Sequence, residues 1–233
     1  PAVMSAHATD PDLDYADFMV AQIAKGIAQA QQNLRPARIG WAMGKDEKNV
    51  FCRRYLMKPG TAATNPFSGT ENDQAQMNPG HGNPNKIKRT GTADPEVAVL
   101  SVQSRDGQPI ALLSNYSTHY VGSPPISADY FAVFCDKIAE KIGARNVSPP
   151  FVAMLSNGTS GDANCLDFDS PEPRKFDRFT VAEDVAQAAF EAYRTIRYYD
   201  WVPLAIDERL LTLGVRMPSE EDVTKAQAVV DEL

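Results

Sequence analysis

The residues with the clearest chemical potential in this chain are its three histidines. His119 follows the apolar run 109–115, His7 follows a short apolar piece ahead of a helical pattern, and His81 lies between glycines. Histidine titrates near neutral pH and is the commonest metal ligand, so general-base chemistry and metal binding are the two candidate roles. A histidine at a strand end is more often a hydrogen-bonded structural residue, and this alternative stays open for His7 and His119. We expect His81 to be only exposed.

A polar turn with the sequence SNGTSGDAN, residues 156–164, follows the apolar run 151–155. The turn has neither the G-x-S-x-G frame of a nucleophile turn nor the lysine of a phosphate-binding loop. Its glycines allow backbone N–H groups to converge on an anion, and Asn157 or Asn164 can donate from its side chain. The alternative is an asparagine-rich strand exit without chemistry.

Two adjacent arginines, Arg53 and Arg54, follow the segment 49–52. A guanidinium beside an apolar strand can donate two parallel hydrogen bonds to a carbonyl or carboxylate. The alternative is a surface pair on an edge strand, and the pattern alone favours that alternative.

The elements that position these residues alternate between strands and helices, which predicts an α/β fold with a mixed β-sheet flanked by helices. Periodicity and capping signals predict helices over residues 12–34, 129–142 and 180–198, and one that starts at Ser219. Strands are predicted over residues 38–43, 49–57, 96–102, 109–115, 151–155 and 204–217. Asp106-Gly107 is predicted to be the hairpin turn between the strands 96–102 and 109–115. The continuous apolar run 151–155 further predicts a strand buried on both faces. We expect residues 59–95, rich in Gly, Pro, Asn and Thr, to form one long surface loop.

Composition narrows the class of protein. The chain has 233 residues, of which 43% are apolar and 23% charged, as in ordinary globular proteins. A net charge of -7 argues against nucleic acid as a partner, because phosphate binding needs clustered Lys and Arg. The one basic cluster, residues 86–89, is expected on a solvated loop. No apolar run approaches the ~20 residues of a transmembrane helix.

The cysteines and the chain ends give two further expectations. Cys52, Cys135 and Cys165 contain no CxxC pair, so buried free thiols are expected, with one disulfide as the alternative. The chain begins on proline and ends at Leu233 inside a helical pattern without a C-cap. We therefore expect a single domain over residues 1–233 that is a fragment of a longer protein. The oligomeric state is not predicted.

Four segments in chain order resemble the neutral/alkaline ceramidase family of zinc amidases, particularly its short bacterial branch. They are similar to the family's histidine-rich segment, its Asn-Arg-Arg segment, the strand pair that ends in the second zinc histidine, and its glycine-aspartate turn. The segments are MSAHATDPDLDY, NVFCRRYLMKPG, DPEVAVLSVQSRDGQPIALLSNYSTHYVG with ISADY, and NGTSGDAN. The similarity runs from Val3 to about Asp169 and continues more weakly to the end. Four motifs in this order are fairly specific for the family, but not for its substrate.

The resemblance implies a role for each matching residue. His119 and His7 would be zinc ligands, although the family has two histidines where this chain has only His7. Arg53 would steady the substrate or the developing charge. The remaining zinc ligands of the family, a glutamate and a tyrosine, would lie beyond Leu233. In the turn, the family's serine position falls on Asn164. We place Arg53, Asn164 and Asp162 among the catalytic residues and Asn157 and Gly161 among the substrate-binding residues.

The implied chemistry is metal-assisted hydrolysis of an amide. Zinc lowers the pKa of bound water toward ~7, and the resulting hydroxide attacks the amide carbon. Arg53 and Asn164 would help zinc to stabilise the oxyanion. Asn164 can donate a hydrogen bond but cannot become an acyl nucleophile, which favours direct attack by water over a covalent serine mechanism.

We therefore expect a zinc-dependent hydrolase of a small-molecule or lipid amide of the ceramide type, which would belong to sphingolipid metabolism. The resemblance also suggests a periplasmic or secreted protein. Ceramide needs an apolar slot for two alkyl chains, whereas residues 60–93 are polar, so the true substrate stays open. The alternatives are a non-catalytic binding or structural member with a degraded metal site, and a serine hydrolase that uses Ser160.

Overall fold

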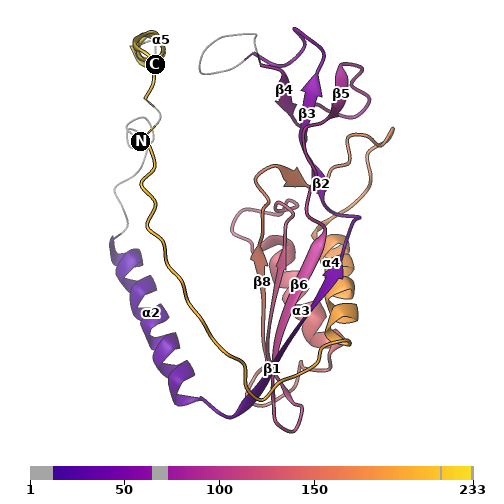
Figure 1. The fold of residues 1–233 in the computed structure, drawn as a ribbon, viewed down its shortest axis with the longest axis vertical. Coiled ribbons are helices and arrows are strands. Elements are labelled where there is room, and N and C mark those ends of the chain that lie inside the picture. The colour runs from indigo at the N-terminus through magenta and orange to yellow at the C-terminus, as the bar shows by residue number, and fades with distance from the viewer. Residues whose placement is uncertain (1–12, 65–72, 216, 232–233) are drawn as a thin grey trace. The chain divides into compact units, whose positions relative to one another are not determined.

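The computed structural model describes residues 13–64, 73–215 and 217–231. The chain divides into two compact units, residues 1–37 and 38–233 (Figure 1). The helix of the first unit, α2, spans Leu13–Gln32 and confirms the helix predicted over 12–34. No helix in the described ranges combines the length and apolar character that a membrane span requires.

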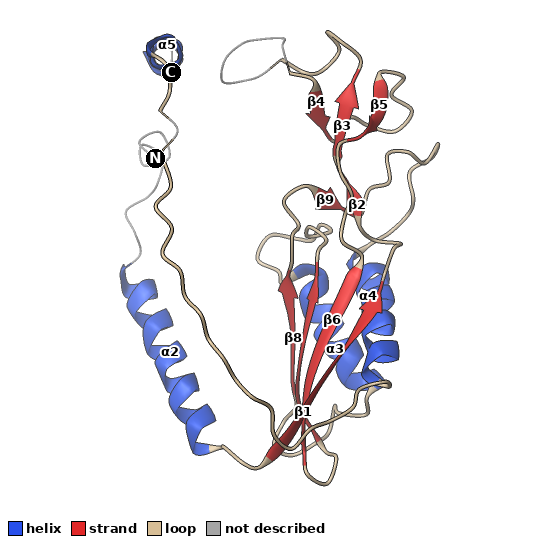
Figure 2. Ribbon diagram, in the orientation of Figure 1, coloured by secondary structure: helices blue, strands red, loops and turns tan. Residues whose placement is uncertain are grey.

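The second unit is built on a mixed four-stranded sheet with the strand order β1-β6-β7-β8 (Figure 2). Strands β6 and β7 form an antiparallel hairpin through the predicted Asp106-Gly107 turn, where Gly107 has a φ of 89°. Strands β7 and β8 are parallel, with Ala111 opposite Val152 and Tyr116 opposite Asn157. These pairings confirm the α/β prediction. The strands are β1 (Ala37–Lys45), β6 (Glu96–Ser104), β7 (Pro109–Tyr116) and β8 (Val152–Asn157).

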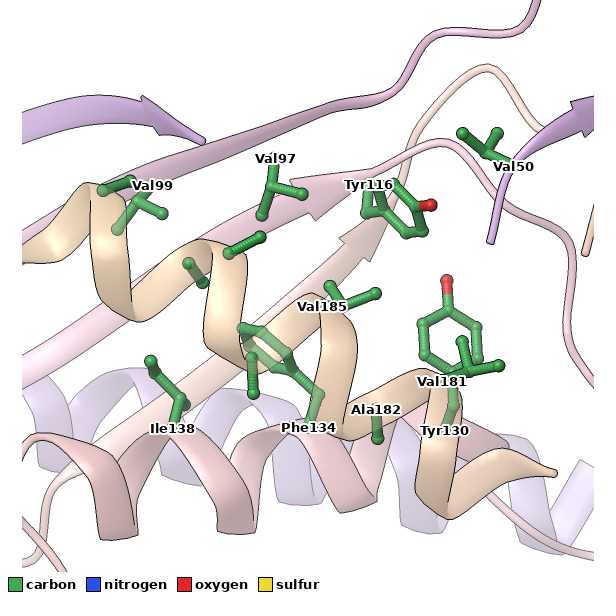
Figure 3. Close-up of a cluster of buried hydrophobic side chains, with 14 of the residues drawn as sticks. Val50, Val97, Val99, Tyr116, Tyr130, Phe134, Ile138, Val181, Ala182 and Val185 are labelled. Carbon is green, nitrogen blue, oxygen red and sulfur yellow. The ribbon is translucent and has the colours of Figure 1, made fainter. Parts of the chain in front are cut away.

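The hydrophobic core lies between one face of this sheet and two helices, α3 (Asp129–Lys141) and α4 (Arg178–Tyr193) (Figure 3). Burying a large apolar side chain contributes roughly 1.5–3 kcal/mol, so this layer is a major source of the unit's stability. The largest fully buried apolar side chains of the cluster come from both layers. They are Val97, Val99, Leu112 and Tyr116 on the sheet, and Tyr130, Phe134, Ile138, Val181 and Val185 on the helices.

Two glycines allow β1 to approach α4 and the segment that follows it closely. A Cβ on Gly44 would lie 2.5 Å from the carbonyl oxygen of Ala188, and one on Gly40 would lie 2.6 Å from that of Arg197. Alternation along the strand then places the large side chains of Trp41 and Met43 on the opposite face, where they are exposed.

The opposite face of the sheet is apolar and exposed within the second unit. Leu100, Leu113 and Met154 are opposite one another in register and all three are exposed. The prediction that strand 151–155 is buried on both faces is wrong, because Val152 and Met154 are 52% and 43% exposed. A continuous apolar run leads to burial on both faces of a strand only when other elements pack against each face. Within the second unit, α3 and α4 pack against one face of the sheet.

The predicted strand over 49–57 is broken at Arg53 into two strands that belong to different sheets. Strand β2 (Phe51–Cys52) pairs with β9 (Ala163–Asn164), and β3 (Arg54–Met57) pairs with β4 (Ala75–Met77) and β5 (Lys86–Arg89). The single-loop prediction for 59–95 is therefore wrong where β4 and β5 form. The basic cluster 86–89 is a strand, whose Arg89 contacts Tyr55, Asp167 and Asp169. Residues 65–72 lie outside the described ranges.

The end of the chain departs from the prediction in two elements. Helix α4 ends at Tyr193, five residues before the predicted end, and Tyr199 then exchanges two backbone hydrogen bonds with Ile39. The strand predicted over 204–217 is wrong for the described residues 204–215, which pair with no other strand there. Helix α5 (Glu220–Asp231) begins as predicted, with Ser219 and Asp222 capping its first turn.

Candidate active site

The ends of β7 and β8 place two predicted features side by side. Because the strands are parallel, both carboxyl ends lie at the same edge of the sheet, which is where open α/β sheets place their ligands. The N–H of Gly158 donates to the carbonyl of Tyr116 at 2.9 Å, and the N–H of Thr159 donates to Ser117 Oγ at 3.2 Å. The turn 158–164 is thereby attached to the segment that carries His119.

The two glycines of the turn meet different surroundings. A Cβ on Gly158 would lie 2.4 Å from Ser117 Oγ and 2.9 Å from Asn115 Oδ1, whereas a Cβ on Gly161 would meet no atom within 4 Å. Gly158 is therefore required for the close approach of the turn to β7, and Gly161 is not required by packing. Asn157 and Asp162 are both exposed.

Arg53 is held against this turn by its backbone and its side chain. Its N–H donates to the carbonyl of Asp162 at 2.8 Å, and its Nη2 donates to the carbonyl of Gly161 at 2.8 Å. The arginine is half-buried and its Nε has no hydrogen-bond partner among the described residues, whereas Arg54 is exposed. The surface-pair alternative therefore fits Arg54 but not Arg53.

Asn164 is buried beneath the turn rather than open to solvent, at 7% exposure. Its Nδ2 donates to Asn78 Oδ1 at 3.0 Å, and its Oδ1 accepts from the N–H of Leu166 at 3.0 Å. Asn78 also donates its N–H to the carbonyl of Arg53 at 2.8 Å. Sequence reasoning missed Asn78. The signal that could have found it is the turn-forming sequence Asn-Pro-Gly at 78–80, where Asn78 has a φ of 52°.

The histidines do not gather in the described part of the chain. His119 is half-buried, with its ring 4.1 Å from that of Tyr120. His81 is not simply exposed, as predicted, because it packs 5.1 Å from the ring of Phe168 and its Nδ1 lies 3.3 Å from the carbonyl of Ser170. His7 lies outside the described residues. Within the described ranges, no group of three or more His, Cys, Asp and Glu side chains is placed to hold a metal.

A buried polar network joins the end of β7 to the loop that precedes Arg53. The hydroxyl of Tyr116 donates to Asp46 Oδ2 at 3.1 Å, and that of Thr118 donates to the carbonyl of Asn49 at 2.7 Å. Asn49 Nδ2 donates to Asp46 Oδ2 at 2.7 Å. Burial and the neighbouring Asp46 carboxylate raise the pKa of Tyr116, so its hydroxyl stays protonated at neutral pH. Sequence reasoning missed this network, which fixes the loop before Arg53 to the segment before His119.

The two cysteines next to the turn, Cys52 and Cys165, are buried. All three thiols are free, as expected, with Cys52 and Cys165 buried and Cys135 half-buried. Burial raises the pKa of Cys165, next to Asn164, to about 11, so its reactive thiolate form is scarce at neutral pH.

No family model matches the chain, and no curated protein matches its sequence. The fold is similar to the crystal structure of neutral ceramidase from Pseudomonas aeruginosa, with 18% sequence identity and a TM-score of 0.46, covering 74% of this chain and 25% of that chain. A ceramidase complexed with C2 gives 18% identity and a TM-score of 0.44, covering 72% of this chain and 24% of that chain. The chain therefore spans about a quarter of the length of these two proteins.

Proposed function

We propose that this chain carries part of the active site of a hydrolase that cleaves the amide bond of a ceramide-like N-acyl compound. The observation that supports the proposal is the attachment of Arg53 to the turn 158–164, at the sheet edge where β7 ends just before His119. Three of the four motif segments that are far apart in the sequence meet at this edge.

Arg53 is the group best suited to stabilise negative charge on a carbonyl oxygen. Its bond to Gly161 orients the planar guanidinium, and the Nη–H groups that this bond leaves over are donors for a bound carbonyl or carboxylate oxygen. Donors held in advance of the reaction stabilise a developing oxyanion without reorganising.

Asn164 supports the turn, and its second Nδ2–H is the donor that we assign to the substrate. Its amide oxygen and one N–H are engaged by Leu166 and Asn78, so the remaining N–H has a defined direction. Asp162 contributes its carbonyl oxygen to Arg53. The exposed Asn157 and Gly161 border the same edge, and we assign them to substrate binding.

Zinc is part of the proposal, with His119 and His7 as ligands. The described residues fit the ion only in part, because His119 supplies one imidazole and belongs to no group of three or more potential ligands in those ranges. When bound, the ion would supply hydroxide at neutral pH. The residues in the described ranges orient the substrate and stabilise the charge that develops on its carbonyl oxygen. No proton transfer is assigned to them. A periplasmic or secreted location stays a prediction.

The test is hydrolysis of a short-chain ceramide by the intact protein, with Arg53→Ala and His119→Ala compared with Arg54→Ala. Arg53→Ala should lower kcat/KM by about a hundredfold or more, the usual effect of removing an oxyanion donor. His119→Ala should abolish activity and also remove the bound zinc, about one ion per chain in the unsubstituted protein. Elemental analysis measures the zinc content. Arg54→Ala, the exposed neighbour, should retain activity. Unchanged hydrolysis in both test variants would contradict the proposal, and a folded protein without zinc or hydrolysis would favour the non-catalytic alternative.

A further inference from the structure

The segment that follows His119 is held by one buried carboxylate, that of Asp129, the first residue of α3. Asp129 is 6% exposed and has a φ of 52°, a left-handed conformation that few residues other than glycine adopt. Both carboxylate oxygens accept two hydrogen bonds each. The donors are the N–H groups of Val121 (3.0 Å) and Tyr130 (2.7 Å) to Oδ1, and the N–H of Gly122 (2.9 Å) and Oγ of Ser123 (3.1 Å) to Oδ2.

This set of partners requires an ionised carboxylate. A carboxylate only accepts hydrogen bonds, whereas a carboxamide of the same shape would direct its own N–H groups at donors. Burial raises the pKa of Asp129, but the hydrogen bonds from Val121, Tyr130, Gly122 and Ser123 outweigh it, and the pKa lies below its ordinary value. The group is therefore charged at neutral pH.

The residues ahead of His119 are also fixed, by the residue next to Asp129. The hydroxyl of Tyr130 donates to the carbonyl of Thr118 at 3.2 Å, and the hydroxyl of Thr118 donates to Asn49. The backbone is thus anchored before His119 by Tyr130 and after it by Asp129, and only His119 and Tyr120 lie between the two anchors.

We propose that Asp129 is a positioning residue for His119, because its four hydrogen bonds set the path of the segment 121–123 and so the direction in which the imidazole leaves the sheet edge. The inference rests on the proposed function, since the direction of this ring matters to chemistry only if His119 takes part in the site. A left-handed residue costs free energy that surrounding contacts must offset, and such residues gather at functional sites.

The experiment uses Asp129→Asn in the intact protein. Asparagine keeps the size of the side chain and tolerates the left-handed conformation, so the substitution changes the acceptor set and little else. Ser123→Ala removes one donor and is the milder variant. Asp136→Asn, an exposed position on the same helix, is the matched control.

The readout is the NMR resonance of the His119 imidazole, without substrate. The chain has three histidines, so a His119→Gln variant assigns the signal, and His81, packed on Phe168, is an internal reference. Asp129→Asn should move the His119 signal, Ser123→Ala should move it less, and Asp136→Asn should leave it in place, with the His81 signal constant throughout. In a hydrolase assay, Asp129→Asn should lower kcat by about tenfold to a hundredfold, as misplacement of a reacting group does.

An unchanged His119 signal in folded Asp129→Asn overturns the inference; if that variant does not fold, an unchanged signal in Ser123→Ala does so. Because this measurement needs no substrate, it is independent of the proposed function. That function fails separately if Arg53→Ala and His119→Ala both retain full hydrolysis.

Discussion

Two polar clusters meet the carboxyl edge of the sheet and differ in how completely their hydrogen bonds are satisfied. The buried network consists of Asp46, Asn49, Tyr116 and Thr118, all at most 5% exposed, and each polar side chain has a partner. The open cluster consists of Arg53, His119 and the turn 158–164. It is largely exposed or half-buried, and the Nε of Arg53 has no partner among the described residues.

The difference indicates a division of roles. Satisfied buried polar groups make a region rigid and specify one arrangement, whereas exposed polar groups at the carboxyl edge of a sheet can exchange water for a ligand. We infer that the buried network supplies stability and position, and that the open cluster supplies binding and chemistry. Substitutions can test whether stability and activity separate in this way.

The largest effect on stability is expected from Asn49→Ala. The side chain donates to Asp46 and Asp184 and accepts from Arg174, so its loss removes hydrogen bonds from three charged groups and opens a gap beside the buried Asp46. Unfolding in urea should show a loss of about 2–4 kcal/mol. The exposed Asn157→Ala is the control and should change stability by less than about 0.5 kcal/mol. Equal stability of the two variants would remove the basis of the comparison.

The second-largest loss of stability is expected from Gly158→Ala, because the new methyl group would lie only 2.4 Å from Ser117 Oγ. Separation of the turn from β7 should cost about 1–3 kcal/mol and also reduce hydrolysis. Gly161→Ala, with open space around it, is the matched control for both measurements. Similar results for the two alanines would show that the turn does not depend on this approach.

Asp129 should make the protein sensitive to acid. Its folded pKa is depressed, so its contribution to stability is complete above the unfolded pKa of about 3.9 and is lost as pH falls through the lower folded pKa. At neutral pH, Asp129→Asn should lose about 1–2 kcal/mol. Below about pH 4 this difference from the unsubstituted protein should shrink. A difference that stays constant down to pH 2 would contradict the assignment.

Arg53→Ala should separate stability from activity most sharply. Its side-chain bond goes to the carbonyl of the exposed Gly161, which water can satisfy, so thermal unfolding should show a loss below about 1 kcal/mol. The large loss of hydrolysis described above should still occur. If Arg53→Ala is destabilised as strongly as Asn49→Ala, the two clusters do not differ in role.

The smallest effect is expected from Ser160→Ala. The Ser160 N–H donates to the carbonyl of Gly158, a backbone contact that alanine retains. Stability should change by less than about 0.5 kcal/mol, and hydrolysis should be unaffected. Loss of hydrolysis with zinc content intact would instead favour the serine-hydrolase alternative.

Local patterns were sufficient to predict the elements that frame the site. Helix α3, the β6–β7 hairpin and β8 follow from periodicity and turn residues that lie within each segment. The attachment of Arg53 to residues 161 and 162 was not predictable, because it depends on the pairing of β2 with β9, which joins segments more than a hundred residues apart. The buried network depends in the same way on contacts between the loop at Asp46 and the distant Tyr116.

The sequence by itself determined the mixed α/β class, the hairpin and the chemical types gathered in the turn, because apolar period and turn preference are local properties. The tertiary structure alone decided that the strand 49–57 breaks at Arg53 and that residues 204–215 pair with no strand in the described part of the chain. It also decided that Asn164 is held by Asn78 and that Asp129 fixes the segment after His119. The physical reason is that hydrogen-bond partners and burial arise from chain segments distant in sequence, which no local pattern encodes.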